Sequence, residues 1–454
     1  MFILERDKYA DTITGGEGVE SAGDTIRLGD DDGTPVVGDM NSRYSTETFV
    51  DLQSGTVEWK DTYSDNAVDV ISEIENVYGA DNGFDTIYGD SQDNYIDVGD
   101  GGSFVITGGG SDTIVSWADT GSGDTVSFHD ITTDSLTYTI NHDGLSVESL
   151  DGNTINVTDF ENVVGTNYTV TGDVIAGDEE VNKIYTQDGN DTVDAGLGDD
   201  VIDARIDLGL ILAQDRGLTY DVRTNSVYRF VNTQADWTVA NAAALADIIG
   251  GEAGKLVTYE SAYEAAVIDS YRPTSGVGSA TWVGAQYSGG NWTWNDGGIT
   301  FHTDSGFTQD VTSLFVYLDG TTAHWEPDNS GTNPYVIHRT STYGLGNEGN
   351  DGSSDNTGNG QAYVVEWDAS DFNTGDNDAN NNNYLEGGAG ADTIFGADGN
   401  DIIYGYLDTN ADYAFDGANV ILAGGGSDTV YGAGGDDTIY LTSDGVADTY
   451  YGNS

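Results

Sequence analysis

Acidic and amide side chains recur at a fixed interval near the C-terminus of this chain. Aspartate or asparagine stands at every ninth position, at Asn383, Asp392, Asp401, Asn410, Asn419, Asp428 and Asp437. Glycines precede most of these positions, and a pair such as Thr-Ile follows. Glycine lets the backbone turn tightly and aim its carbonyl oxygens at a cation. The carboxylate adds the hard oxygen that calcium prefers. These residue types could therefore supply oxygen ligands to a cation in repeated turns.

The repeat resembles the nonapeptide of the RTX (repeats-in-toxin) family, most clearly in GGAGADTIF (387–395), GADGNDIIY (396–404), AGGGSDTVY (423–431) and GAGGDDTIY (432–440). The resemblance implies a parallel β-roll that folds on binding Ca²⁺. The ligands that it implies here are Gly387, Gly388, Gly390, Asp392, Gly399, Asp401, Gly424, Gly426, Asp428, Gly435 and Asp437. A flexible Gly/Asp-rich linker is the alternative. A linker has no reason to keep its register, yet Asp401 and Asp428 remain 27 residues apart across a stretch where the consensus decays.

The same interval appears twice in the N-terminal half. The first run is Asp85, Asn94, Ser103 and Asp112, and the second is Asp173, Asn182, Asp191 and Asp200. We expect Asp85, Asp112, Asp191 and Asp200 to bind calcium. The motifs IENVYG (74–79) and FENVVG (160–165) precede the runs, which indicates a duplicated unit. Between them, residues 135–160 alternate apolar and polar side chains around Asp-Gly turns, which predicts antiparallel hairpins.

The charge of the chain restricts its partners. Asp and Glu total 79 against 13 Lys and Arg, a net charge of −66. Such a chain is expanded until cations neutralise it, and binding to nucleic acid or to an anionic membrane is disfavoured. No run of 18 apolar residues exists, so we expect no membrane insertion. The absence of cysteine excludes disulfides and thiol chemistry.

The RTX resemblance also implies a secreted or cell-surface protein that uses type I secretion. The first residues, MFILERDKYADTITGG, have too short an apolar stretch for a signal peptide. The chain ends in DTYYGNS without an obvious C-terminal secretion signal. We therefore expect either a fragment of a longer protein or an atypical signal.

The composition changes near residue 205, and six of the eight tryptophans lie between Trp237 and Trp367. Apolar residues at 237, 240, 244, 245, 248 and 249 predict an amphipathic helix over 237–249, ended by Gly250-Gly251. An S-x-x-E capping box over 261–264 predicts a second helix through Tyr271. The expected order is a strand at 226–230, these two helices, and further strands that end at 362–368.

This order of elements resembles a C-type lectin-like domain over about residues 215–369. The motifs that carry the resemblance are WVGAQ (282–286), WTWNDGG (292–298), WEPDNSG (325–331), GNEGND (346–351) and AYVVEWD (362–368). The resemblance implies a calcium ion held by Glu326, Asp328, Asn333, Asn350 and Asp351, and a sugar bound by Glu326, Asp328, Asn350 and Asp351. Calcium takes about six to eight oxygen ligands, so positions remain for two sugar hydroxyls. The mixed Glu-Pro-Asp triplet leaves the sugar preference open. The alternative is a lectin-like fold that binds protein through another surface.

We expect a mostly β protein in which parallel β-roll modules flank an α+β C-type lectin-like domain. The expected parts are a duplicated N-terminal roll region (1–204), the lectin-like domain (205–370), an Asn/Asp linker (371–382) and a C-terminal roll (383–454). Stacked buried rows are expected at Ile184, Val193, Ile202, Ile394, Ile403, Ile421, Val430 and Ile439.

Neither an H-E-x-x-H zinc motif nor a G-x-S-x-G nucleophile elbow is present, and the five histidines are scattered, which argues against an enzyme. The expected function is a secreted, calcium-dependent glycan-binding adhesin that can self-associate. The alternative is a structural surface or matrix protein whose lectin-like domain binds protein.

Overall fold

The chain divides into two units in the computed structural model. The first, here called the roll unit, comprises Met1–Gln214 and Gly375–Ser454, and the second, the inserted unit, comprises Asp215–Thr374. The residues that the structure describes are 2–5, 10–15, 23–29, 47–60, 68–79, 84–99, 102–116, 123–141, 145–150, 153–215, 217–221, 224–259, 264, 267–268, 280–288, 291–295, 300–303, 306–307, 335–339, 345–348, 361–369, 372, 381–406, 417–440 and 445–452.

One long sheet runs through the roll unit. Its thirteen strands, in spatial order, are β2 (Thr12–Thr14), β6 (Val68–Ser72), β5 (Thr56–Lys60), β4 (Glu47–Asp51), β8 (Phe84–Tyr88), β10 (Phe104–Ile106), β12 (Thr125–Ser127), β16 (Asn162–Val164), β18 (Lys183–Tyr185), β20 (Val201–Asp203), β34 (Thr393–Phe395), β36 (Val420–Leu422) and β38 (Thr438–Tyr440). Most neighbouring strands are parallel, and only the β4–β5–β6 group is antiparallel.

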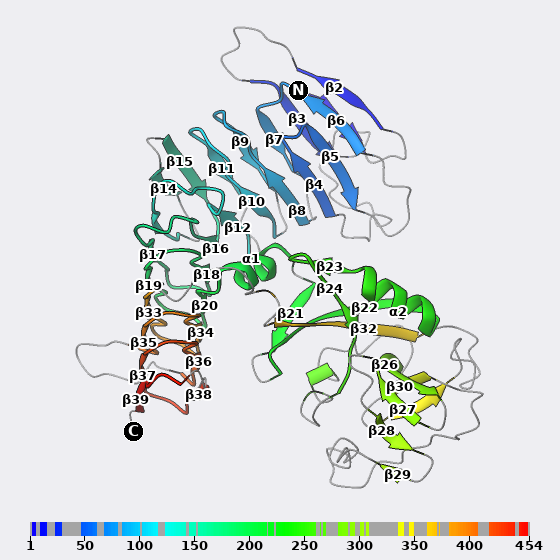
Figure 1. Ribbon diagram of the computed structural model, residues 1–454. Helices are drawn as coiled ribbons and strands as arrows, with labels where there is room; N and C mark the ends of the chain where they lie inside the picture. The colour runs from blue at the N-terminus through cyan, green and yellow to red at the C-terminus, as the bar shows by residue number, and fades with distance from the viewer. Residues whose placement is uncertain are drawn as a thin grey trace. The chain divides into compact units, whose positions relative to one another are not determined.

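Two seven-stranded sheets complete the roll unit. One contains β1 (Phe2–Glu5), β3 (Thr25–Gly29), β7 (Asn76–Tyr78), β9 (Tyr95–Asp97), β11 (Thr113–Val115), β15 (Asn153–Thr158) and β14 (Leu145–Leu150). The other contains β13 (Thr137–Thr139), β17 (Val174–Ala176), β19 (Thr192–Asp194), β33 (Tyr384–Glu386), β35 (Ile402–Tyr404), β37 (Thr429–Ala433) and β39 (Thr449–Gly452). Successive strands of the chain alternate between facing sheets and form the stacked coils of a β-roll (Figure 1).

The nine-residue period arises because each repeat supplies one three-residue strand and one turn. Within a strand, the middle side chain points into the roll and its neighbours point outward, as in Thr192-Val193-Asp194. The predicted rows are confirmed: Ile184, Val193, Ile202, Ile394, Ile403, Ile421 and Val430 are all fully buried in one core, and Ile439 is partly buried against it.

The N-terminal and C-terminal repeats form one continuous stack. Strand β19 pairs with β33, which sets Val193 beside Leu385, and β20 pairs with β34, which sets Ile202 beside Ile394. The sequence alone predicted two modules on either side of the lectin-like region. The strand pairing shows that the two modules form one stack. The inserted unit is part of the chain segment that connects β20 to β33.

One detail of the roll differs from the sequence prediction. Residues 145–158 form one hairpin, β14–β15, whereas β13 pairs in parallel with β17, because burial against the roll outweighs the local turn signal. The backbone N–H of Asp401 donates to the side chain of Asp428, 27 residues ahead, so the period is kept across the stretch where the consensus decays. Residues 407–416, including the predicted ladder position Asn410, lie outside the described residues.

Helix α1 (Ile206–Gln214) follows β20 and belongs to the roll unit. Its Leu210 and Leu212 pack against a buried cluster on the long sheet that is formed by Phe104, Ile106, Val164 and Tyr185. Arg205 precedes the helix and forms a buried bidentate ion pair with Asp203, at 2.8 and 2.7 Å. Its guanidinium also lies 4.0 Å from the ring centre of Phe395.

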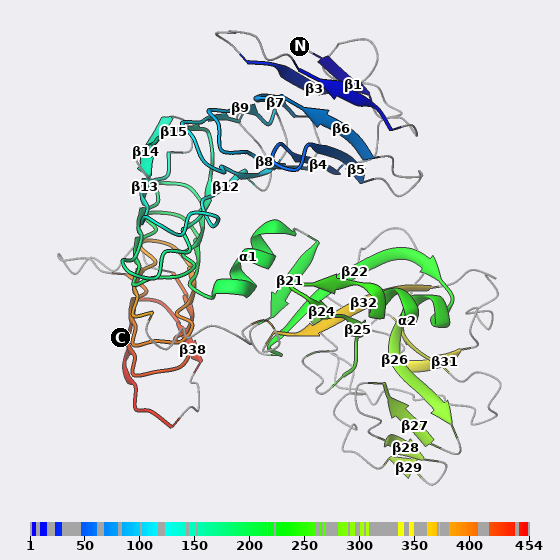
Figure 2. The ribbon, with the colours of Figure 1, turned by 45° about the horizontal axis from the view of Figure 1, so that its top comes forward.

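The inserted unit contains one helix of known bounds, α2 (Trp237–Ala246), and a ten-stranded sheet. The strands are β21 (Leu218–Asp221), β22 (Ser226–Ala235), β32 (Gln361–Asp368), β26 (Ala280–Ser288), β27 (Asn291–Trp294), β28 (Thr300–Thr303), β29 (Gly306–Phe307), β25 (Lys255–Leu256), β30 (Tyr335–Arg339) and β31 (Leu345–Glu348). The strands predicted at 226–230, 282–286 and 362–368 are confirmed. Antiparallel β22 and β32 lie side by side and bring the two ends of the unit together, with Ser226 opposite Asp368 (Figure 2).

The predicted helix over 237–249 is shorter than expected. It ends at Ala246, and Ile248–Ile249 (β23) pairs with Glu252–Ala253 (β24) instead. Gly250 and Gly251 both have positive φ, 53° and 88°, which suits a two-residue hairpin turn. Of the second predicted helix, only Glu264, Val267 and Ile268 lie among the described residues, and they are helical. No helix in the described part of the chain is long and apolar enough to cross a membrane.

Neighbouring isoleucines test the alternation of β35. Ile403 is fully buried, whereas Ile402 is 42% exposed on the outer face. We expect Ile403→Ala to lower the free energy of unfolding of the calcium-bound roll by ~2–5 kcal/mol, because it removes buried methyl groups and leaves a cavity. Ile402→Ala is the matched control and should cost far less. Urea unfolding of both variants in calcium measures the difference, and equal losses would contradict the nine-residue register.

Candidate calcium sites in the stacked turns

The turns that join the two facing sheets are stacked in two columns. In each column the same ladder position is filled by an aspartate or asparagine. The first column contains Asp173, Asp191, Asn383, Asp401 and Asp428, and the second contains Asn182, Asp200, Asp392, Asn419 and Asp437. The backbone N–H of each ladder residue donates to Oδ1 of the next, for example from Asp200 to Asp392 at 2.9 Å. One side-chain oxygen therefore holds each turn to its neighbour. Aspartate and asparagine can both supply that oxygen.

In four of the turns the second carboxylate oxygen makes no hydrogen bond within the described part of the chain. Oδ2 of Asp112, Asp191, Asp200 and Asp401 is buried and has no hydrogen-bond partner among the described residues. These four side chains are at most 1% exposed. Burying a carboxylate oxygen without a compensating partner is costly. By contrast, the equally buried Asp203 is paired with Arg205. Among the described residues no basic side chain neutralises these four aspartates, so a bound cation or a proton must do so.

The backbone of the turns explains the glycine pattern. Positive φ occurs four and two places before the aspartate in the turns that end at Asp112, Asp191, Asp200, Asp392, Asp401, Asp428 and Asp437. At the earlier position φ is 66–98°. Most turns have glycine there, and three have Gln187, Ala397 or Ala433. At the later place, where φ reaches 145° in Gly390, only glycine occurs. A residue with a Cβ can adopt the φ of the earlier position at an energetic cost, whereas the larger φ of the later position favours glycine.

The same glycines bring carbonyl oxygens close to the next turn. A Cβ placed on Gly390 would lie 1.5 Å from the carbonyl oxygen of Gly198, and one on Gly426 would lie 1.5 Å from that of Gly399. Each turn therefore presents backbone oxygens and one carboxylate oxygen to its neighbour. An all-oxygen surface of this kind suits calcium. The described residues contain no group of three or more His, Asp or Glu side chains that could hold a metal, so backbone oxygens must complete such a site.

The structure brings together all of the predicted turn residues in the repeats. Gly387, Gly388, Gly390 and Asp392 form the turn between β33 and β34, Gly399 and Asp401 that between β34 and β35, Gly424, Gly426 and Asp428 that between β36 and β37, and Gly435 and Asp437 that between β37 and β38. Gly196 and Gly198, before Asp200, are turn residues that the sequence prediction missed. Their spacing, four and two places before an aspartate, is the signal that identifies them.

The N-terminal runs follow the same rule with local changes. Asn94 N–H donates to Asp112 Oδ1 at 2.9 Å, and Asp85 N–H donates to the Ser103 hydroxyl at 3.4 Å. The hydroxyl of Thr48 also donates to Asp85, so a protein group occupies one oxygen of that carboxylate. Asp112 thus matches the C-terminal turns more closely than Asp85 does.

The motifs 74–79 and 160–165 form equivalent contacts. The Glu75 carboxylate accepts a hydrogen bond from Asp24 N–H at 2.6 Å, and the Glu161 carboxylate accepts one from Asp124 N–H at 2.5 Å. The next residue, Asn76 or Asn162, donates its side-chain N–H to the carbonyl of the same aspartate. Each motif therefore binds an aspartate from an earlier coil of the roll, Asp24 or Asp124.

The residues predicted to bind sugar and calcium in the inserted unit, Glu326, Asp328, Asn333, Asn350 and Asp351, lie outside the described residues. The structure does describe a hairpin that lies between Asn333 and Asn350 in the sequence. Strands β30 and β31 are antiparallel, and their terminal pair is Tyr335 with Glu348. In the sequence, Asn333 is two places before Tyr335, and Asn350 is two places after Glu348.

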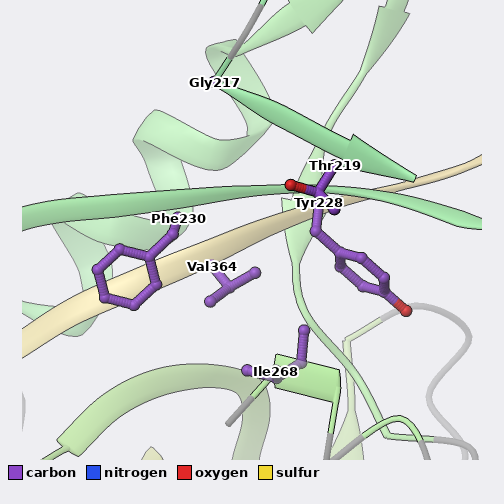
Figure 3. Close-up of a pocket in the computed structure, with 6 residues that line it drawn as sticks. All are labelled: Gly217, Thr219, Tyr228, Phe230, Ile268 and Val364. Carbon is purple, nitrogen blue, oxygen red and sulfur yellow. The ribbon is translucent and has the colours of Figure 1, made fainter. Parts of the chain in front are cut away.

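A small cavity lies elsewhere in the inserted unit (Figure 3). It has a volume of about 160 Å³ and is lined by Gly217, Thr219, Tyr228, Phe230, Ile268 and Val364. Ligand pockets usually measure roughly 300–1,000 Å³. Nearby, the Tyr228 hydroxyl donates to Glu264 at 2.8 Å, and Glu366 accepts hydrogen bonds from the Ser226 hydroxyl and the Thr258 N–H. These hydrogen bonds link β22 with β32 and with Glu264, so we assign them a stabilising role in the inserted unit.

Glycine two places before the aspartate is the sensitive position of the turn. We expect Gly426→Ala to weaken calcium binding by the C-terminal repeats, because its Cβ would collide with the Gly399 carbonyl oxygen and φ is 119°. Gly452→Ala is the control, since nothing lies within 4 Å of the added Cβ. Calcium titrations followed by calorimetry compare the two proteins, and equal affinities would contradict the proposed turn geometry.

The turn carboxylates also predict how pH affects the calcium-free roll. Burial raises the pKa of Asp200 and of Asp401 to about 8 and that of Asp112 to about 7. An unfolded aspartate has a pKa of about 3.9. Between these values the folded chain binds more protons than the unfolded chain, so stability falls as the pH rises from about 4 to about 8.

We therefore expect the urea midpoint of the calcium-depleted protein to be higher at about pH 5.5 than at about pH 8.5. Excess calcium should reverse this order, because protons and calcium compete for the same carboxylates. Circular dichroism at both pH values, with and without calcium, measures the four midpoints. A calcium-free midpoint that is higher at the alkaline pH would show that the buried carboxylates have another compensating partner.

Comparisons with known proteins agree with this assignment for the repeats. A model of the RTX calcium-binding nonapeptide repeat matches four copies, at residues 80–105, 169–202, 379–410 and 413–444. A comparison with curated protein sequences found no match.

Among solved structures, the C-type lectin CEL-I from Cucumaria echinata is 18% identical, with 34% of this chain and 95% of that chain covered at a TM-score of 0.23. The calcium-independent C-type lectin SPL-2 from Saxidomus purpuratus is 20% identical, with 34% and 94% covered at a TM-score of 0.23. The cow C-type carbohydrate-recognition domain of CD23 is 13% identical, with 34% and 94% covered at a TM-score of 0.21.

The four matched segments contain the stacked turns and their buried aspartates, and such repeats bind Ca²⁺. The roll unit thus carries RTX calcium-binding nonapeptide repeats at these four places.

Proposed function

We propose that the chain is a secreted, calcium-dependent carbohydrate-binding protein with an adhesin role. The β-roll supplies a calcium-stabilised scaffold, and the inserted unit is a C-type lectin-like domain that binds a glycan through a calcium ion. The observation that carries the proposal is the register of the β30–β31 hairpin, whose terminal pair is Tyr335 and Glu348.

This register supports a common site for the motif residues. Because Tyr335 and Glu348 are opposite each other, the chain enters β30 and leaves β31 at the same end of the hairpin. Asn333 and the pair Asn350-Asp351 are within three positions of that end in the sequence. We propose that they meet Glu326 and Asp328 there and hold one calcium ion.

The chemistry of these five side chains favours a sugar as the ligand. All of them offer oxygen atoms, and calcium accepts about six to eight. The remaining positions suit two neighbouring hydroxyls, which the same carboxylates can also bind as hydrogen-bond acceptors. A net charge of −66 disfavours anionic partners, so we propose a neutral glycan. Single-site binding of this kind is weak, about millimolar, and firm adhesion would come from many copies on one surface.

A second candidate function has one specific observation in its favour. In the inserted unit, Val239, Leu245 and Ile248 are 57%, 57% and 62% exposed. Large apolar side chains that gather on a surface can mark a protein interface. The alternative is therefore a surface or matrix protein whose inserted unit binds a protein partner through α2 and β23.

Changing one carboxylate of the motif separates the two functions. We expect Glu326→Ala to abolish binding to a neutral-glycan array, because it removes both a calcium ligand and an acceptor for a sugar hydroxyl. Charge-assisted hydrogen bonds are worth about 1.5–3 kcal/mol each, which is a large part of a millimolar affinity. Glu252→Ala, which changes an exposed carboxylate of the same unit, is the matched control and should bind normally.

The measurement is array binding of both variants and of the wild type, in calcium and in chelator. If the wild type binds equally well in chelator, or Glu326→Ala binds as the control does, the calcium-bridged mechanism is wrong. If no glycan binds and a Leu245→Asp change disrupts binding to a protein surface, the second function is the correct one.

A further inference from the structure

An outward-facing row of tyrosines runs along the C-terminal coils of the roll. Strands β33, β35, β37 and β39 lie next to one another in one sheet (Figure 1). Their register places Tyr404 beside Tyr431 and Tyr431 beside Tyr451. The second residue of each strand points into the roll, so these tyrosines, which are the third residues, lie on the outer face. These three residues form the tyrosine row.

The rings of the tyrosine row are stacked with their planes nearly parallel. The ring centres are 4.6 Å apart in both pairs, with interplanar angles of 3° for Tyr404–Tyr431 and 8° for Tyr431–Tyr451. Carbon atoms in contact are roughly 3.5–4.0 Å apart, so parallel rings whose centres are 4.6 Å apart are offset sideways. Each ring therefore covers only part of its neighbour's face. Tyr384 adds a fourth ring, 5.5 Å from Tyr404 and tilted by 45°.

The tyrosine row is accessible to solvent, and aliphatic and hydroxyl side chains lie beside it. Tyr451 is 50% exposed, and Tyr404 and Tyr431 are partly exposed. Ile402, which is 42% exposed, and Thr429 are the first residues of β35 and β37 and face outward next to the row. Exposed apolar side chains that gather in this way can mark a binding surface.

The charges near the tyrosine row restrict the ligand that it can bind. Glu386 is beside Tyr404 in the register of the sheet. Burial is the main cause of the raised pKa of Tyr384 and of Tyr404, and the charge of Glu386 raises both pKa values further. No Lys or Arg follows Arg339, so the four strands carry no basic side chain. An anionic ligand is therefore disfavoured, whereas carboxylate and phenol groups can both bind hydroxyl groups.

The size of this face favours a narrow ligand over a protein partner. Four neighbouring strands span about 15 Å, and three residues along a strand span about 10 Å. Such a face covers roughly 150 Å², whereas a stable protein interface buries roughly 800 Å² on each partner. A linear chain that runs across the four strands fits these dimensions.

We propose that the tyrosine row binds a neutral, extended polysaccharide whose chain of sugar rings runs from coil to coil along the roll. Sugar rings have apolar C–H faces that pack on aromatic rings, and their hydroxyls can hydrogen-bond to phenol and carboxylate groups. A β-1,4-linked chain is flat and straight, and each sugar advances it by a distance close to the spacing of about 4.8 Å between neighbouring strands. One sugar per coil therefore stays near one tyrosine.

This surface belongs to the roll unit, whereas the lectin-like motif belongs to the inserted unit. The inference therefore does not rest on the calcium-bridged site around Glu326. The two sites also differ in what they recognise, because a calcium-bridged site binds the hydroxyls of a single sugar, whereas the tyrosine row contacts several sugars of one chain.

The length of the ligand tests the arrangement. We expect the affinity of the full, calcium-loaded chain for a neutral β-1,4-linked oligosaccharide to rise from the disaccharide to the tetrasaccharide and then to level off, because each added sugar contacts one more coil. Calorimetry with glucose, N-acetylglucosamine and mannose oligomers of two to six units measures the series. The matching free monosaccharide is present in excess, to occupy a site that recognises single sugars. Affinity that does not change with length, or the absence of binding in all three series, would overturn the proposal.

Tyr431→Ala tests the row itself, because it removes the central ring of the stack. We expect the dissociation constant of the tetrasaccharide to rise about tenfold, as the loss of one aromatic contact predicts. Tyr78→Ala is the matched control. It removes a partly exposed ring that lies 5.6 Å from Tyr95 in a different sheet of the roll unit, and it should leave the constant unchanged.

A second variant keeps the test decisive if Tyr431→Ala does not fold in calcium, which circular dichroism checks. Tyr451→Ala removes the more exposed ring of the next coil and should weaken binding in the same direction. If the folded variants of the row bind the tetrasaccharide as tightly as Tyr78→Ala does, the oligosaccharide lies elsewhere and the proposal is wrong.

Discussion

Buried negative charge in the turns is the constraint on which the roll depends. Asp401, for example, accepts a hydrogen bond from Asn383 N–H of the neighbouring turn at 2.7 Å, and its second carboxylate oxygen is buried without a hydrogen bond among the described residues. Stacking places these carboxylates above one another, where each raises the cost of ionising its neighbours. Calcium removes this cost, and it supplies folding energy because the sites do not exist in the unfolded chain. The same ions that neutralise the chain thus determine its folded form.

The remaining features of the roll follow from that arrangement. A turn that presents carbonyl oxygens to an ion needs two residues with positive φ, and the second of them reaches values that only glycine adopts readily, as in Gly390. The strands between turns are only three residues long, so each contributes a single buried side chain, such as Val193 or Ile394. A short strand cannot be stable alone. The core forms only when successive coils stack and bury these side chains in continuous rows.

The inserted unit is built on a different principle. It has no cysteine, and its core is formed by large side chains such as Trp282, which is fully buried and donates its Nε1–H to the Ala235 carbonyl at 2.7 Å. Buried polar groups on three elements, Tyr228, Glu264 and Glu366, are linked by hydrogen bonds to one another or to their neighbours. Pairing of its first and last long strands brings its ends together. A unit with adjacent ends can replace one turn of a roll without disturbing the register on either side.

The sequence by itself determined the local chemistry of the roll. The interval of nine, the glycines and the apolar residue two places after each aspartate predicted the turns, the buried rows and the calcium ligands, because these depend on residues close together in the chain. The order of motifs also predicted the main strands of the inserted unit. For the lectin-like site, Glu326 and Asp351 remain predictions from that order.

Only the tertiary structure decided which turns face each other. The pairing of Asp200 with Asp392, 192 positions away, could not be read from the period, because nine-residue units before and after an insertion look alike in sequence. Tertiary packing also made β13 a parallel strand and made Ile248–Ile249 part of a hairpin. In each case, burial and long-range hydrogen bonding stabilise the observed pairing more than the local sequence preference stabilises its alternative. Sequence spacing specifies which residues each turn contains, whereas the fold specifies which two turns lie next to each other.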